Sequence, residues 1–194
     1  MILSNCEIHK ALDSKKLVIS PEPLPRQLSI DVPHCPYNTH SVDLKLHHEI
    51  SVPGEGAFMI DFTQPGSIPD LLSKHSKKFT LSKDQPYRLQ RGQFILARTL
   101  EKIELSTSHG QPYLAARIEG KSSRARCGLL VHFTAPTVHP GFCGSLTLEI
   151  INLGPAAISL VPEMYIAQLI VEEVNGELIL NPSQFQHQTT PEGK

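Results

Sequence analysis

The stretch IEGKSSRARCGLLVHFTAPTVHPGFCGSLTLEIIN, residues 118–152, holds the most distinctive chemistry of the chain and two predicted strands, at 128–134 and 145–151. It opens with a turn at 120–126 that gathers small residues and hydroxyls beside three cations. Backbone amides, serine hydroxyls and cationic side chains all favour anions, so this turn suits a polyphosphate. The stretch ends in an alternating apolar run with one acid, Glu149. Because a carboxylate is costly to bury unless it is hydrogen-bonded or used, the two features indicate a nucleotide site with a general base.

Alternating apolar residues on both sides of this stretch predict an all-β fold. Further strands are expected at residues 41–46, 79–81, 86–90, 93–99, 102–105, 113–119, 157–161, 165–173 and 177–180. Glycine and proline separate most of them, which is typical of an antiparallel barrel or jelly roll. One helix is expected at 4–15, capped by Ser4 or Asn5, and a helical turn is expected near 68–74.

Length and composition narrow the functional classes. With 194 residues, the chain is predicted to form a single domain over 1–194, with a mobile tail at 181–194. A net charge of −1 gives no electrostatic signature of a nucleic-acid partner or an anionic membrane. No apolar run approaches the roughly 18 residues that a membrane span needs. The four cysteines lack CxxC spacing, which favours free thiols and a cytoplasmic location.

The central motifs resemble the dCTP deaminase branch of the dUTPase superfamily. The segments that carry this resemblance are GKSSRARCGLLVH (120–132), TA and HPGFCG within 134–144, LTLEI (146–150), LQRGQFILARTLEKIEL (89–105), SVDLKL (41–46) and LVISPEP (17–23). The resemblance implies a dUTPase-like distorted jelly-roll barrel with a short N-terminal helix. It also implies a homotrimer with active sites shared between subunits, and hydrolytic deamination of dCTP to dUTP and ammonia.

Three catalytic residues follow from the resemblance. Glu149 would take a proton from the water that attacks C4 of cytosine, and would then return protons to N3 and the departing amine. Ser122 and Arg126 would hold the attacking water and the polar edge of the site. The residues alone leave other interpretations open, because Glu149 could be an outward-facing acid on an amphipathic strand. The KSSR cluster could likewise be an ordinary polar turn at the surface.

The same turn is implied to bind the phosphates. The substrate contacts expected there, besides Ser122 and Arg126, are Lys121, Ser123, Arg124 and Ala125. The family usually has arginine where Lys121 stands, and lysine loses the bidentate fork on phosphate oxygens. Weaker phosphate binding is therefore expected at this position.

Contacts to the sugar and base are implied further along the chain. His139 stands where the family has an aspartate that accepts a hydrogen bond from the sugar 3′-hydroxyl, and a neutral imidazole can still accept through one nitrogen. Backbone groups of Thr147 and Leu148 would read the base edge. The carbonyl of Ala135 would face the 4-amino group or the water.

The C-terminal motif FQHQ, residues 185–188, resembles the segment with which these enzymes close over the triphosphate. It makes Gln188 a candidate ligand and Phe185 a partial anchor. Gln184 stands where the family often has a phosphate-binding lysine. A polar tail without a binding role is the alternative interpretation.

A metal mechanism is also considered, because deamination often uses zinc. Zinc deaminases need H-x-E together with P-C-x-x-C. His47, His48 and Glu49 match the first half, but the chain has no CxxC, so no zinc is expected. Magnesium is expected to arrive on the nucleotide triphosphate, with water and few protein ligands.

Two rival functions remain open. One is a dUTPase, or a bifunctional enzyme that releases dUMP and pyrophosphate. Against it, pure dUTPases prefer an aspartate where His139 stands, and a glycine-rich phosphate-binding tail. The other is a nucleotide-binding or regulatory protein that has lost catalysis. Lys121, His139 and the altered tail favour that interpretation, whereas the presence of Ser122, Arg126 and Glu149 opposes it.

Overall fold

The computed structural model describes residues 1–30, 34–54, 56, 60–63, 67–180 and 185–194, and its regular structure is mostly strand. The strands are β1 Leu17–Ser20, β2 Val42–Lys45, β3 Glu49–Pro53, β4 Ser76–Thr80, β5 Tyr87–Leu89, β6 Phe94–Leu105, β7 Tyr113–Gly120, β8 Leu129–Val131, β9 Thr137–Val138, β10 Cys143–Asn152, β11 Ile158–Leu160 and β12 Tyr165–Val174. The helices are α1 Asn5–Asp13, α2 Ile68–His75 and α3 Ser122–Ala125. The all-β prediction is confirmed. No helix in these ranges is long and apolar enough to cross a membrane.

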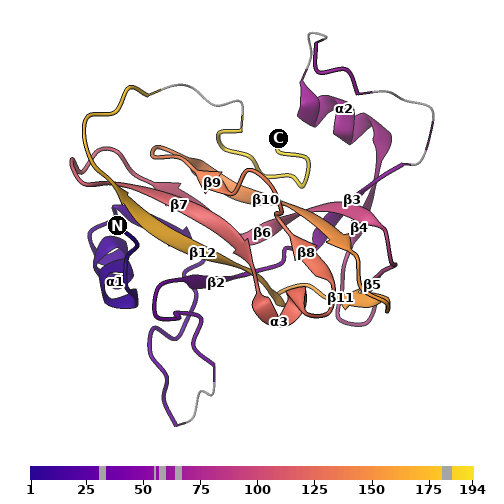
Figure 1. Ribbon diagram of the computed structural model, residues 1–194, viewed down its shortest axis with the longest axis horizontal. Helices are drawn as coiled ribbons and strands as arrows, with labels where there is room; N and C mark the ends of the chain where they lie inside the picture. The colour runs from indigo at the N-terminus through magenta and orange to yellow at the C-terminus, as the bar shows by residue number, and fades with distance from the viewer. Residues whose placement is uncertain (31–33, 55, 57–59, 64–66, 181–184) are drawn as a thin grey trace.

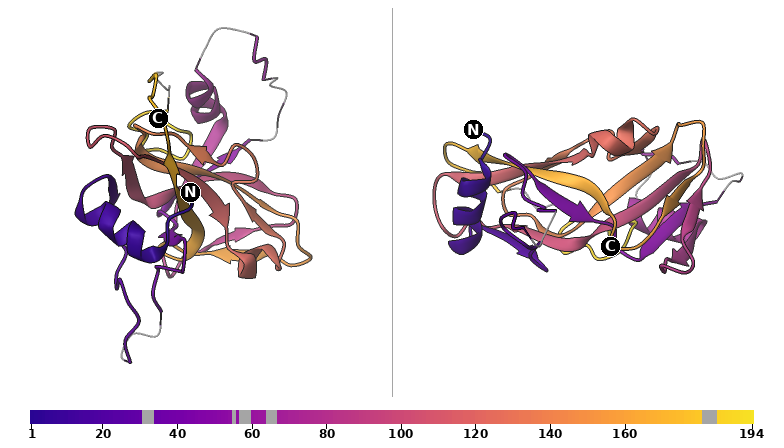
Figure 2. Two further views of the ribbon diagram at one scale, coloured as in Figure 1. Left: turned by 60° about the vertical axis from the view of Figure 1, so that its left-hand side comes forward. Right: turned by 90° about the horizontal axis from the view of Figure 1, so that it is seen from below.

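The strands form two larger sheets and one small one. The six-stranded sheet has the order β4-β3-β6-β10-β8, with β1 paired to β6, and the four-stranded sheet has the order β2-β12-β7-β9. Strands β5 and β11 make a separate pair. The assigned strand pairings are all antiparallel. The molecule is elongated, with α1 at one end and β4 and β5 at the other (Figures 1 and 2).

A single hydrophobic core joins the two larger sheets. It contains Leu44 of β2 and Leu169 of β12 from one sheet, and Ile95 of β6 and Ile150 of β10 from the other, all four of them fully buried. Burying such a side chain completely is worth about 1.5–3 kcal/mol. Successive side chains of β6 and β10 point to opposite faces of the sheet, so the burial of Ile95 and Ile150 sets which of their neighbours face outwards.

Helix α1 confirms the predicted N-terminal helix. The Ser4 hydroxyl accepts a hydrogen bond from the backbone N–H of Glu7 (3.3 Å), so Ser4 is the cap. Ile8, Ala11 and Leu12 form the buried face. Helix α2 confirms the predicted helical turn near 68–74.

Several predicted strands differ from the observed ones. The two predicted strands at 93–99 and 102–105 are one continuous strand, β6, because no glycine or proline interrupts that run. The strand predicted at 177–180 is not formed. These residues pair with no described strand, and Ile179 and Leu180 are exposed. Strands β1, β3 and β9 were not predicted.

Gly128 and Gly154 allow the backbone after α3 to lie very close to the backbone after β10. Gly128 has a φ of +86°, and a Cβ atom on it would stand 2.2 Å from the backbone nitrogen of Gly154. A Cβ atom on Gly154 would stand 2.0 Å from the carbonyl oxygen of Cys127. Side chains cannot fit at either position, so the end of α3 is packed against the loop that follows β10.

Candidate active site

Residues of α2, β9, β10 and the C-terminal segment line a cavity of about 670 Å³. Figure 1 shows where these elements lie. The volume of the cavity is within the range of small-molecule sites. Six of the residues predicted for the site line it: Ala135, His139, Thr147, Glu149, Phe185 and Gln188. Apolar side chains, among them Leu96, Ile118 and Phe142, form much of the remaining wall.

Glu149 lies in the middle of β10 and faces this cavity. Its neighbours Leu148 and Ile150 are fully buried, whereas 32% of the Glu149 side chain is exposed. Alternation along the strand thus turns Leu148 and Ile150 towards the core and Glu149 away from it. A carboxylate in this position can reach a molecule held in the cavity.

His132 contacts Glu149 from the end of β8. Its Nδ1 lies 2.8 Å from Oε2 of Glu149, and its Nε2 lies 3.1 Å from the carbonyl oxygen of Ala135. Burial lowers the pKa of His132, but the hydrogen bond and charge of the Glu149 carboxylate outweigh burial, so the net effect raises that pKa. The imidazole therefore connects the two groups expected to act on the 4-amino end of cytosine.

The backbone around His132 is unusual. His132 has a φ of 52° and Ala135 a φ of 56°, a left-handed conformation that few residues other than glycine adopt. Such conformations are often retained where a site needs them. Sequence reasoning missed His132 because a lone histidine at a strand end carries no spacing signal. Only the pairing of β8 with β10 brings it opposite Glu149.

Thr147, Leu148 and His139 occupy different environments. Thr147 lines the cavity, and its Oγ1 is buried without a hydrogen-bond partner among the described residues. The Leu148 side chain is fully buried in the core, so only its backbone is available for binding. His139 is exposed at the cavity wall, where its carbonyl accepts from the N–H of Phe142 (3.1 Å).

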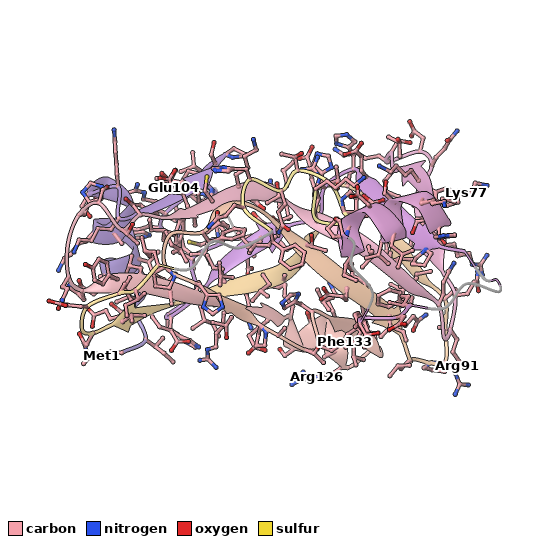
Figure 3. All side chains as sticks on the ribbon, turned by 90° about the horizontal axis from the view of Figure 1, so that it is seen from above. Met1, Lys77, Arg91, Glu104, Arg126 and Phe133 are labelled. Atoms are coloured by element: carbon pink, nitrogen blue, oxygen red, sulfur yellow. The ribbon has the colours of Figure 1, made fainter. Side chains whose placement is uncertain are left out.

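The GKSSRAR turn lies away from the cavity. Ser122, Ser123, Arg124 and Ala125 form α3, Arg126 is its C-cap, and all five are exposed. None of them lines the cavity. In Figure 1, α3 and the C-terminus lie on opposite sides of the molecule, and Figure 3 shows Arg126 at the molecular edge. A single chain therefore does not bring Ser122 and Arg126 to Glu149.

Lys121 is engaged by a buried acid. Its Nζ lies 2.5 Å from Oδ1 of Asp43 on β2, and Asp43 is 1% exposed. The same carboxylate oxygen accepts a hydrogen bond from the Asn38 side chain (3.0 Å). The cation expected at the phosphates is therefore paired inside its own chain.

The C-terminal segment 185–194 packs beside β10. The N–H of His187 donates to the Cys143 carbonyl (2.6 Å), and the N–H of Ser145 donates to the Gln188 carbonyl (3.0 Å). The Gln188 side chain is buried and donates to the Ser145 carbonyl (2.6 Å). Gln184 lies outside the described residues. The mobility predicted for the tail stays a prediction.

Glu192 lines the cavity and was not anticipated from the sequence. Its side chain is buried, and Oε1 accepts a hydrogen bond from the Ser51 hydroxyl of β3 (2.7 Å). Its other oxygen lies 3.7 Å from the Lys78 ammonium. At the chain end, Lys194 forms an ion pair with Asp70 of α2 (2.5 Å). Sequence reasoning treated this segment as a tail, but the contacts of Glu192 and Lys194 join it to residues more than 100 positions away.

One group of potential metal ligands stands out in the described part of the chain: His47, His48 and Glu49. Arg98 already engages two of them, because its guanidinium donates to His47 Nε2 (2.7 Å) and to Glu49 Oε2 (3.1 Å). Burial, followed by the charge of Arg98, lowers the pKa of His47 to about 4. These residues do not line the cavity.

Comparison with known proteins gives a consistent result. The model of the dCTP deaminase-like family matches residues 2–174. A Dictyoglomus thermophilum protein named dCTP deaminase, dUMP-forming, is 36% identical over 172 residues, which cover 87% of this chain and 78% of the relative. A Thermomicrobium roseum protein named dCTP deaminase is 37% identical over 176 residues, covering 90% and 81%.

A solved structure shows the same fold. The crystal structure of 2′-deoxycytidine 5′-triphosphate deaminase from Agrobacterium tumefaciens superposes with a TM-score of 0.61 at 20% identity. The superposition covers 92% of this chain and 49% of that chain, so the present chain matches about half of its length.

Proposed function

The chain belongs to the dCTP deaminase-like family, and on this basis we propose that it deaminates dCTP hydrolytically to dUTP and ammonia, with Glu149 as the general base. The observation that carries the proposal is the position of Glu149 in the cavity wall, beside His132 and the Ala135 carbonyl. A carboxylate, an imidazole and a carbonyl acceptor then surround the place where the amine would leave.

In the proposed reaction, Glu149 takes a proton from water while the water oxygen forms a bond to C4 of cytosine. The proton passes to N3, and the second proton of the water goes to the amino group. The C4–N4 bond then breaks, and the amine leaves as ammonia while the C4 carbonyl of uracil forms. His132, at 2.8 Å from Glu149, is well placed to share a proton with the carboxylate during these transfers.

The rest of the nucleoside would lie along the cavity wall. Apolar residues such as Phe142 can pack against the base and sugar, and backbone groups of Thr147 and Leu148 can read the base edge. The Ala135 carbonyl would accept from the 4-amino group, and the exposed His139 would accept from the sugar 3′-hydroxyl. Gln188 and its neighbours would cover the triphosphate.

A complete site needs a second subunit in this proposal. Ser122 and Arg126, with Ser123, Arg124 and Ala125, are exposed at α3 and do not line the Glu149 cavity of their own chain. We therefore propose a homotrimer in which α3 of one subunit completes the cavity of its neighbour. The exposure of all five residues supports this arrangement, because they can contact a neighbouring subunit without any change in the hydrophobic core of their own subunit.

The reaction is proposed to need no zinc. In the proposed reaction Glu149 activates the attacking water by taking its proton, whereas in zinc deaminases a zinc ion activates the water. Magnesium would enter as part of the substrate, bound to the triphosphate. Activity that persists after treatment with a zinc-selective chelator, in buffer containing magnesium, would support this. Activity that is lost with the chelator and restored by zinc would contradict it.

The direct test is to incubate the purified protein separately with dCTP, dUTP and CTP, and to resolve the products by chromatography. The expected result is dUTP and ammonia from dCTP. Release of dUMP and pyrophosphate would support the bifunctional alternative, which the name of the Dictyoglomus thermophilum relative favours. If no product forms from dCTP, the proposed function is wrong.

A further inference from the structure

We propose that Lys121 is a positioning residue, which fixes the start of α3 through the buried carboxylate of Asp43 and does not bind the phosphates of dCTP. This inference rests on the proposed function, because it assigns a role within the same site. Lys121 lies where β7 ends and the exposed turn with Ser122 and Arg126 begins.

The first step is the ion pair itself. Lys121 Nζ lies 2.5 Å from Asp43 Oδ1, and the two side chains are 20% and 1% exposed. The other carboxylate oxygen, Oδ2, lies 3.6 Å from Nε2 of His34. Removing an ammonium from a buried carboxylate leaves an uncompensated charge, which is strongly unfavourable. Lys121 therefore cannot turn towards a phosphate at low energetic cost.

The second step is the frame that holds this pair. Strand β12 lies between β2 and β7, and its Gln168 is opposite both Asp43 and Glu119. The Gln168 side chain donates to the Gly120 carbonyl (3.3 Å) and accepts from the Ser41 hydroxyl (3.1 Å). Through Gln168 of β12, these polar contacts tie Gly120, the residue before Lys121, to Ser41, two residues before Asp43.

The third step links Lys121 to α3. Its carbonyl accepts hydrogen bonds from the N–H groups of Arg124 (2.9 Å) and Ala125 (3.0 Å). Lys121 is the N-cap, but an ammonium has no acceptor, so its side chain makes no capping bond. The side chain is instead directed to Asp43. The position of this four-residue helix is therefore set by the anchored Lys121 backbone.

The experiment is a double-mutant cycle with Lys121→Met, Asp43→Asn and the double variant. The first readout is amide hydrogen exchange at Arg124 and Ala125, which needs no nucleotide. Both single variants should exchange these amides at least about tenfold faster, and the double variant no faster than the worse single. Unchanged exchange in Lys121→Met would overturn the proposal. Lys102→Met, an exposed lysine of β6, is the matched control.

The second readout separates positioning from phosphate binding. Affinities for dCTP and dCMP are measured by calorimetry in a Glu149→Gln background. Adding Lys121→Met should change the ratio of the two affinities by less than about twofold. In the protein that keeps Glu149, Lys121→Met should lower kcat about tenfold or more. A ratio lowered about tenfold would show that Lys121 binds phosphate, and would overturn the inference.

A third variant keeps the test decisive if Asp43→Asn does not fold. Lys121→Arg retains the charge that pairs with Asp43, so it should preserve kcat and the parent exchange rates of the Arg124 and Ala125 amides. A positioning role predicts no gain in dCTP affinity, whereas a phosphate ligand should bind more tightly with the guanidinium fork. Absence of dCTP turnover by the unmodified protein would contradict the proposed function only, because the exchange readout is independent of turnover.

Discussion

At the scale of single residues, one imidazole contacts two functional groups of the cavity. Nε2 of His132 faces the Ala135 carbonyl, which can only accept a hydrogen bond, so Nε2 is the protonated donor. The other ring nitrogen, Nδ1, faces the Glu149 carboxylate. The raised pKa of His132 agrees with a proton held between these two side chains. Water or the 4-amino group of a substrate would have to compete with His132 for both groups.

Glu149→Gln should greatly slow deamination and retain the fold. The amide has nearly the same shape but cannot accept a proton from water, so kcat should fall by about 10²–10⁴. The measurement is dUTP production from dCTP, with thermal melting as the test of folding. Glu177→Gln, an exposed acid outside the cavity, is the control. A Glu149→Gln variant that turns over near the parent rate would remove Glu149 from its assigned role.

Glu101 has no place in the proposed reaction, yet it should control stability. It is 1% exposed on β6, and burial raises its pKa to about 7, opposed by the hydrogen bond from the Lys45 N–H (3.0 Å). The folded state then binds a proton more tightly than the unfolded state, whose carboxyl has a pKa of 4.5. The contribution of Glu101 to stability therefore falls as pH rises from about 4.5 to 7, by on the order of 3 kcal/mol.

Glu101→Gln should remove this loss, because the amide cannot ionise and its oxygen can still accept from Lys45. The free energy of unfolding, measured by urea denaturation at pH 5 and pH 8, should differ less between the two pH values than in the parent. Glu104→Gln, exposed on the same strand, should leave the difference unchanged. An identical pH dependence in Glu101→Gln and the parent would contradict the assignment.

At the scale of elements, the C-terminal segment depends on β10 and β3 for its position. Backbone bonds join His187 and Gln188 to β10, and the buried Glu192 carboxylate accepts from Ser51 of β3. Hydrogen bonds to a charged group are worth about 1.5–3 kcal/mol. This one contact can therefore decide whether the end of the chain stays packed.

Glu192→Ala should release the segment without unfolding the sheets. The amide of Ser145, which donates to the Gln188 carbonyl, reports on release and should exchange about tenfold faster or more. Hydrogen exchange measured by NMR gives this rate. Exchange at Leu148, inside the β10–β6 pairing, should be unaffected. If the Ser145 amide keeps its parent rate, Glu192 does not hold the segment.

At the scale of the whole molecule, the proposed site is not complete within one chain. Glu149 lies in the cavity, whereas Ser122 and Arg126 are exposed on α3 away from it. A closed ring of identical subunits can supply both halves, because each subunit then offers its α3 to one neighbour and its cavity to the other.

Mixing two inactive variants should therefore restore activity. If Glu149→Gln and Ser122→Ala subunits are refolded together in equal amounts, about a quarter of the shared sites receive both intact residues. Activity should reach about a quarter of the parent value, and light scattering should show a trimer. Each variant refolded alone is the control. A mixture no more active than these controls would show that Ser122 and Glu149 do not act across an interface.

Local pattern in the sequence was enough to predict the all-β class, the capped helix α1 and the segments that carry the candidate site. Alternation and capping depend on neighbouring residues, so they can be read from the chain. The resemblance of the central motifs pointed to the family that the comparisons show. The roles assigned to Glu149, Ser122 and Arg126 remain predictions.

Only the tertiary structure decided which of these residues meet. The pairing of β8 with β10 sets His132 against Glu149, and the β2–β12–β7 order sets Asp43 against Lys121. The same folding separates α3 from the cavity and buries Glu192 beside Ser51. The contacts of His132 with Glu149 and of Ser51 with Glu192 join residues 17 and 141 positions apart. Strand order and register determine such distances, and no local pattern in the sequence encodes them.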